Sequence, residues 1–324
     1  MIDISNIWWG LPGASATFRA QLTAQIRRGV VLRLEDPIPF SDVLWEGIGQ
    51  TLGCPVRTLE WTDRERWPGD FLLKHLFSPR IRAGYFPDDS YGTYLASLSH
   101  PTTVLRIRGV RGLEAIQGWM ELVEDYRAAG GQDLILAVEC EGNAGAGAMT
   151  HRTDRNQSRG FALLLSGLLS NTALPAYQAE LAWSLCPGDP EKCAELLLRG
   201  EQLLLDPTGT AATLGLDEDQ TESAIQKADL VCLFPKIEQC RFAFLRKHRD
   251  ILARYLPIRN IEGELIDDPM ELEVTHVSYL IRNRPALQSL PGADLIILCA
   301  NVRNQIAHNQ PVPYATLLTL EHCI

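Results

Sequence analysis

Hydrophobic positions in the first half of the chain alternate between helical and strand spacing. Between Ser15 and Arg28 the apolar residues Phe18, Leu22 and Ile26 recur every four positions, which is the stripe of an amphipathic helix, and Gly29 follows as its stop signal. Short segments rich in apolar and β-branched residues predict strands at 30–34, 56–61, 102–108 and 133–139. Helices are expected at 43–52 and 113–129, the first capped by Ser41 or Asp42. Strands that alternate with helices in this way predict an α/β fold around a parallel sheet.

Two segments of this half lack a clear period. The polar stretch 62–90 is rich in Arg, Asp and Pro and predicts loops with one helix near 71–77. The small-residue run Gly142–Gly147 is expected to be a flexible connector. The pair Trp8-Trp9 beside Gly10 is expected in a buried corner of the fold.

From Asp154 onward the pattern is helical, and no segment predicts a strand. Helical spacing covers 161–170, 176–185, 190–205 and 221–233, and Asp206-Pro207-Thr208-Gly209 marks a turn. We therefore expect three parts: an α/β domain over 1–150, a helical connector over 151–215, and a helical domain over 216–324.

The last part is expected to be a small up-and-down bundle. A long helix is predicted from Phe234 to Tyr255, ended by Pro257. Asp268 and Pro269 are suited to begin the next helix, which runs to Ile281. Two further helices are expected at 291–308 and 314–323, separated by Pro311 and Pro313.

Composition narrows the function. The 324 residues carry a formal net charge of -10, which argues against a protein that coats duplex DNA with its whole surface. The 8 cysteines show no zinc spacing and are expected as buried free thiols, so no metal and no cofactor is expected. Neither a signal peptide nor an apolar run long enough to span a membrane is seen, which predicts a cytoplasmic protein.

A parallel sheet invites a search for a phosphate-binding loop. The loop after the strand 30–34 reads EDPIPFSD; it has no Gly and no Lys, and it carries carboxylates and prolines that would repel or fail to bind phosphate. The strand 102–108 ends at Arg108 and not at an Asp that could hold magnesium. We therefore expect a nucleotide-binding-like domain without hydrolytic parts, acting as a scaffold or a protein-binding surface.

The segment Arg303-Asn304-Gln305-Ile306-Ala307-His308 is the best candidate for chemistry. Arg303 offers a permanent charge that fits phosphate, and His308 exchanges a proton near neutral pH. These are the groups that metal-free RNA cleavage needs. Asn304 shares a helix face with His308, whereas Arg303 lies roughly 140° away, so Arg303 must reach over or the partner groups must come from a second subunit.

The spacing of Arg303 and His308 near the end of a helical bundle resembles the signature of the HEPN superfamily, over about 230–324. The resemblance implies a bundle that dimerises and acts as a metal-independent ribonuclease or RNA-binding effector, as in bacterial antiviral defence. It implies catalytic roles for Arg303 and His308, with Asn304 in support. Tyr314 and His276 are further candidates to line the site.

Two other interpretations stay open. Arg and His near a helix C-terminus are favoured by the helix dipole alone, and Glu271 and Glu273 are expected to form a solvated face. The protein would then be a non-catalytic adaptor that docks on a partner ATPase or nuclease.

Overall fold

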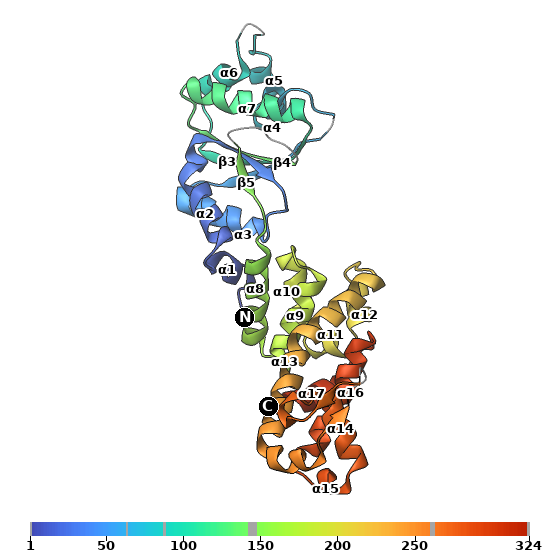
Figure 1. Ribbon diagram of the computed structural model, residues 1–324. Helices are drawn as coiled ribbons and strands as arrows, with labels where there is room; N and C mark the ends of the chain where they lie inside the picture. The colour runs from blue at the N-terminus through green and yellow to red at the C-terminus, as the bar shows by residue number, and fades with distance from the viewer. Residues whose placement is uncertain (1, 63, 87–88, 142–147, 260–262, 323–324) are drawn as a thin grey trace. The chain divides into compact units, whose positions relative to one another are not determined.

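The computed structural model describes residues 2–62, 64–86, 89–141, 148–259 and 263–322. The chain divides into two compact units, Met1–Ser158 and Arg159–Ile324 (Figure 1). The helices of the expected connector 151–215 belong, from Arg159 on, to the same unit as the last helices. The candidate Gly142–Gly147 lies outside the described residues.

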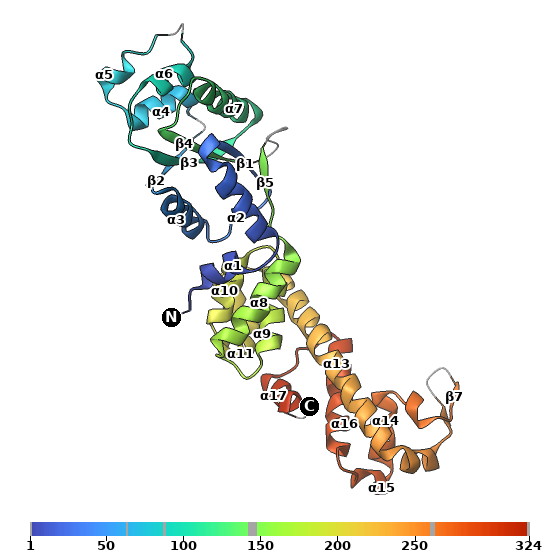
Figure 2. The same ribbon diagram turned by 90° about the vertical axis from the view of Figure 1, so that its left-hand side faces the viewer.

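The first unit is built on a sheet of five parallel strands in the order β2-β3-β4-β1-β5, so the expected parallel α/β architecture is confirmed. Helices lie on both of its faces, with α4, α6 and α7 on one and α2 and α3 on the other (Figure 2). The strands are β1 (Val30–Leu34), β2 (Val56–Glu60), β3 (Thr103–Arg111), β4 (Leu134–Glu141) and β5 (Met149–His151). The helices are α1 (Ile4–Gly10), α2 (Ala14–Gln25), α3 (Ser41–Leu52), α4 (Pro68–Leu76), α5 (Pro79–Arg82), α6 (Tyr91–Ser97) and α7 (Leu113–Ala128).

The polar stretch that predicted one helix holds more helical structure than expected. Pro68 and Pro79 each stand in the first turn of a helix, where a missing N–H costs nothing, and the Ser90 hydroxyl accepts from the Thr93 amide to start α6. The expectation of a single helix there was wrong because these short helices are set by their first turns and not by a long apolar period. The pair Trp8-Trp9 is buried, as expected.

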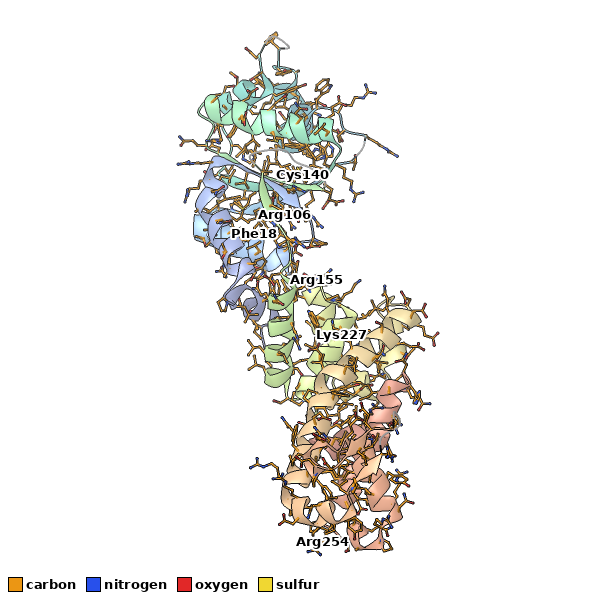
Figure 3. The ribbon with its side chains drawn as sticks, in the orientation of Figure 1. Phe18, Arg106, Cys140, Arg155, Lys227 and Arg254 are labelled. Atoms are coloured by element: carbon orange, nitrogen blue, oxygen red, sulfur yellow. The ribbon has the colours of Figure 1, made fainter. Side chains whose placement is uncertain are left out.

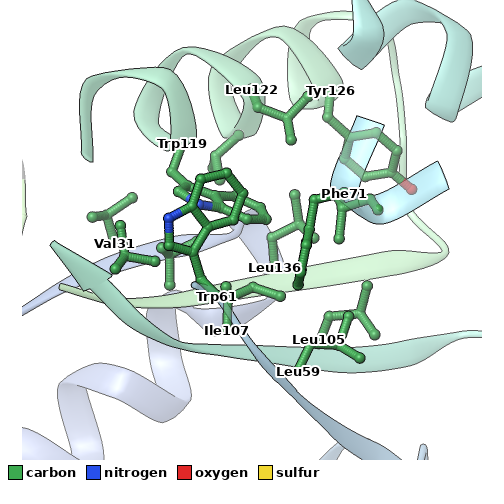
Figure 4. Close-up of a cluster of buried hydrophobic side chains, with 14 of the residues drawn as sticks. Val31, Leu59, Trp61, Phe71, Leu105, Ile107, Trp119, Leu122, Tyr126 and Leu136 are labelled. Carbon is green, nitrogen blue, oxygen red and sulfur yellow. The ribbon is translucent and has the colours of Figure 1, made fainter. Parts of the chain in front are cut away.

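A compact aromatic cluster lies between β3, β4 and the helices α4 and α7 (Figure 4). Trp61, Phe71 and Trp119 meet edge to face, with ring centroids 5.2 Å (Trp61–Phe71), 5.5 Å (Trp61–Trp119) and 6.0 Å (Phe71–Trp119) apart. Such aromatic pairs stabilise a core by about 0.5–1.5 kcal/mol beyond the area they bury. This face of the sheet is therefore a packed core.

In the residues that the structure describes, the second unit is helical apart from one short hairpin, β6 (Ile258–Arg259) and β7 (Leu265–Ile266), so the expectation of no strand after Asp154 was wrong. These strands have two residues each, too few to show a period. The helices are α8 (Arg155–Leu169, which begins in the first unit), α9 (Pro175–Leu185), α10 (Pro190–Leu198), α11 (Glu201–Leu205), α12 (Pro207–Ala212), α13 (Glu218–Leu252), α14 (Val274–Asn283), α15 (Pro285–Gln288), α16 (Ala293–Ala307) and α17 (Tyr314–His322).

The helix α13 runs through the predicted boundary at Phe234, with Pro235 inside it. Proline removes one helical hydrogen bond, but α13 packs against both α9 and α16, and this packing keeps the helix continuous. A kink occurs instead at His248, whose Nε2 lies 3.1 Å from the Pro291 carbonyl oxygen. Asp268 caps the short 3-10 turn Pro269–Glu271, and α14 begins later, at Val274, with Glu273 as its N-cap.

The helices α13 and α16 run antiparallel. At one end Gln226 is hydrogen-bonded to Asn309, and at the other His248 contacts Pro291. The buried stripe of α16 includes Ile296, Cys299, Ala300 and Ile306. Residues on that stripe therefore face the interior of the bundle, and residues on the opposite side face solvent.

Candidate functional site

His308 closes the helix α16. The backbone of His308 is no longer helical. Its amide donates to the carbonyl oxygens of Asn304 and Gln305, both at 3.1 Å. Pro311 and Pro313 follow and prevent the helix from continuing. The imidazole is exposed, so solvent or a ligand can reach it.

A polar stripe runs along the outer face of α16 up to this histidine. Asn301, Asn304 and His308 are spaced three and four residues apart and are all exposed. The Arg282 Nη2 donates to the Asn301 Oδ1 at 2.8 Å, so α14 adds a guanidinium to the stripe. Sequence reasoning missed Arg282, because only the packing of α14 against α16 brings it there.

Arg303 stands on the other side of the helix, in the stripe that includes Ile296 and Cys299. Its side chain is half-buried. Among the residues that the structure describes, no hydrogen bond or ion pair holds its guanidinium. A partly desolvated charge without a partner is unfavourable, and such charges are usually paired. The structure therefore leaves Arg303 available to an anion.

The described residues do not bring Arg303 and His308 into contact. They are five residues apart on α16, roughly 140° around the helix, and one faces the packed side while the other faces solvent. Within one chain the face of His308 is shared by Asn301 and Asn304 and not by Arg303. A single site that uses both Arg303 and His308 needs either a reaching arginine or a second copy of the chain.

The two other candidates have different surroundings. The His276 Nδ1 accepts a hydrogen bond from the Glu273 amide at 3.3 Å, in a reciprocal cap that begins α14. The imidazole of His276 is thus engaged in holding a helix end, and Glu273 is a capping residue and not simply solvated. Tyr314, the first residue of α17, lines a cavity of the second unit. The pKa of its hydroxyl is raised, mainly by burial and also by the nearby Glu201 carboxylate.

That cavity has a volume of about 610 Å³ and lies against α13. Its lining includes Asp219, Glu222 and Asp229 from α13 and the segment Asn309–Tyr314, which follows His308 directly. Asp229 is 2% exposed, and the Tyr177 Oη donates to its Oδ1 at 2.7 Å. Burial raises the pKa of Asp229 to about 6. No local sequence pattern predicted this cavity, because its lining residues come from segments about 90 residues apart in the chain.

The raised pKa of Asp229 predicts a stabilising substitution. A carboxyl whose folded pKa lies above its unfolded value binds protons more tightly when folded, so it lowers stability as the pH rises from about 4 to above 6. Asp229→Asn keeps an acceptor for Tyr177 and removes the buried charge. We expect it to raise the free energy of unfolding at pH 7.5 by about 2–3 kcal/mol, and to change stability little at pH 4. Urea unfolding at the two pH values measures this; equal effects at both would contradict it.

In the first unit, the loop after β1 is engaged with its own chain. The Asp36 Oδ2 accepts from the Thr153 amide at 3.0 Å, and its carbonyl oxygen lies 3.1 Å from the His151 Nδ1. The N-cap of the helix α3 is Phe40, which has a left-handed backbone conformation and provides no side-chain cap, so the prediction of a Ser41 or Asp42 cap was wrong.

Asp42 instead reaches a buried ion pair on the sheet. The Arg106 guanidinium on β3, labelled in Figure 3, donates to both carboxylate oxygens of Glu139, at 2.7 Å and 3.2 Å, and to Asp42 at 3.2 Å. The Trp45 Nε1 donates to the same Glu139 at 2.9 Å. Arg106 also lines a cavity of about 590 Å³ beside α3, but each of its three nitrogens already donates to a carboxylate, so its charge is paired within the chain.

No family model and no curated protein matches the chain. Among solved structures, the Thermotoga maritima RuvB Holliday junction branch migration motor has 11% sequence identity and a TM-score of 0.37, over 94% of this chain and 87% of that one. A variant of the same protein gives 12% identity and a TM-score of 0.34, over 93% and 85% of the two chains. Function is therefore argued from the site residues.

Within the described part of the chain, no helix is long and apolar enough to cross a membrane. In the same residues no cluster of three or more His, Cys, Asp or Glu is placed to hold a metal ion. The seven described cysteines are free thiols, five of them buried, as expected from their apolar surroundings, and Cys323 lies outside the described residues.

Proposed function

We propose that the helical unit binds RNA, and cleaves it without a metal ion, at the C-terminal end of α16, in the manner of HEPN domains. The observation that carries the proposal is the state of Arg303: a half-buried guanidinium with no partner in the described residues, five residues before an exposed imidazole. A phosphodiester supplies the missing counter-charge.

The chemistry follows from the groups at hand. His308 takes the proton of the ribose 2′-hydroxyl as that oxygen attacks phosphorus. The imidazolium so formed returns the proton to the 5′-oxygen as its bond to phosphorus breaks, which leaves a 2′,3′-cyclic phosphate and a 5′-hydroxyl. Arg303 stabilises the charge that builds on phosphorus. Asn304 and the Arg282–Asn301 pair are placed along the same outer face to hold the backbone of the RNA. Because Arg303 and His308 lie on different faces, two copies of the unit complete the site, which is the homodimer that the HEPN resemblance implies.

The first unit has a supporting role in this proposal. The loop after β1, where a phosphate-binding loop would lie, carries Asp36 and two prolines, and Asp36 contacts Thr153 and His151 of the same unit. The unit therefore serves as a sensor-like or partner-docking module. An RNA-directed effector joined to such a module fits a regulator of bacterial antiviral defence.

Arg303→Ala tests the binding half of the proposal. We expect the affinity for a labelled single-stranded RNA to fall by about tenfold or more, since a charged hydrogen bond to phosphate is lost. Fluorescence anisotropy at fixed salt measures it. Arg254→Ala is the matched control, because Arg254 is an exposed arginine of the same unit that lies after α13 and not on α16. If the wild-type protein binds no RNA, the proposal fails, and docking on a partner ATPase or nuclease remains as the alternative.

A further inference from the structure

The cavity beside α13 is acidic on one wall. Asp219, Glu222, Gln226 and Asp229 follow one another at spacings of three, four and three residues, so one face of the helix presents them all to the cavity. Asp219 and Glu222 are exposed near its rim, and Asp229 is buried. Of the described residues that line the cavity, none is Lys or Arg.

The buried carboxylate lacks a counter-ion. Asp229 accepts a hydrogen bond from Tyr177, and within the described residues it forms no ion pair. A buried charge is normally neutralised by a partner of opposite sign. Three carboxylates without a cation also disfavour any phosphate-bearing ligand here. The missing element is therefore a positive group.

The apolar part of the lining determines the rest of the ligand. It is formed by apolar side chains from several segments, which suit a methylene chain and not a strongly hydrated ion. These residues are Leu204, Leu205, Ile306, Pro311, Val312, Pro313 and Leu317. The volume of about 610 Å³ lies within the range of ordinary small-molecule sites, which is about 300–1,000 Å³.

We propose that this cavity binds an alkyl guanidinium or alkyl ammonium group, with Asp229 as its counter-ion and the proline-rich segment around its aliphatic stem. The group belongs either to a free small molecule or to an Arg or Lys side chain of a partner protein. The segment Asn309–Tyr314 lines the cavity and directly follows His308, so a bound ligand fixes the position of the chain next to His308. The effect of such a ligand on RNA binding or cleavage rests on the proposed function.

Isothermal titration of the full chain with agmatine, and separately with a Gly-Gly-Arg-Gly-Gly peptide amide, tests the proposal. We expect Asp229→Asn to weaken binding by about ten- to a hundredfold, as expected for a lost charge-assisted contact, and Glu222→Gln to weaken it less. Glu218→Gln is the matched control, because Glu218 is an exposed carboxylate of the same helix that does not line the cavity.

The outcomes separate the sources and the two proposals. Tighter binding of agmatine than of the peptide assigns the site to a small molecule, and tighter binding of the peptide assigns it to a partner protein. If neither probe binds the wild type, or if Asp229→Asn binds as the wild type does, the inference is overturned. His308→Ala should bind the same probe unchanged, so a failure of RNA cleavage leaves this result standing.

Discussion

Glu139→Ala is expected to lower the free energy of unfolding of the α/β unit by about 3–5 kcal/mol, the usual cost of leaving a buried charge without its partner. The Arg106 side chain is only 3% exposed, and Glu139 supplies both of its short contacts, at 2.7 Å and 3.2 Å. After the substitution only Asp42 remains, and its side chain is 95% exposed. Trp45 loses its acceptor as well. Urea unfolding, with hydrogen exchange at β3 and β4 to localise the effect, measures the loss.

Glu141→Gln on the same strand is the matched control. Glu141 pairs with Arg111 at 2.7 Å, a contact as short as the buried one, but the side chains are 52% and 65% exposed. Exposed pairs contribute about 1 kcal/mol or less. If the two substitutions cost the same, burial does not set the strength of the Arg106–Glu139 pair.

This ion pair shows where prediction from the sequence ends. The apolar run around Arg106 predicted β3, because a buried strand of a parallel sheet reads as an apolar segment. The pairing with Glu139 and Asp42 could not be predicted, since these partners lie 33 and 64 residues away in the chain. A strand can be predicted from its own residues. The partner of a buried charge cannot, because it depends on the register in which β3 pairs with β4.

The helical unit shows the same division. The end of α16 follows from Pro311 and Pro313, and the different faces of Arg303 and His308 follow from the helical period, so both were predictable. The stripe that Arg282 joins and the cavity around Asp229 depend on how α13, α14, α16 and α17 pack. The continuity of α13 through Pro235 has the same cause, because packing outweighed a local breaker.

His308→Ala is expected to reduce RNA cleavage at least about 100-fold, because a positioned general acid or base contributes roughly 10²–10⁴ in rate. RNA affinity should change little, since Arg303 and the Asn301–Asn304 face remain. Single-turnover cleavage of a labelled RNA separates the two quantities. His322→Ala is the control, because His322 is an exposed histidine of the same unit, on α17, whose Nδ1 contacts its own helix at the Leu318 carbonyl oxygen.

A mixture of the two inactive variants determines whether two chains share the site. In a dimer of Arg303→Ala with His308→Ala, one composite site keeps both wild-type groups if each site takes its arginine from one chain and its histidine from the other. Cleavage then returns on mixing, although neither variant cleaves alone. If the site lies within one chain, every site in the mixture lacks one group, and no activity returns. Arg303 and His308 lie roughly 140° apart on α16, which favours the first result.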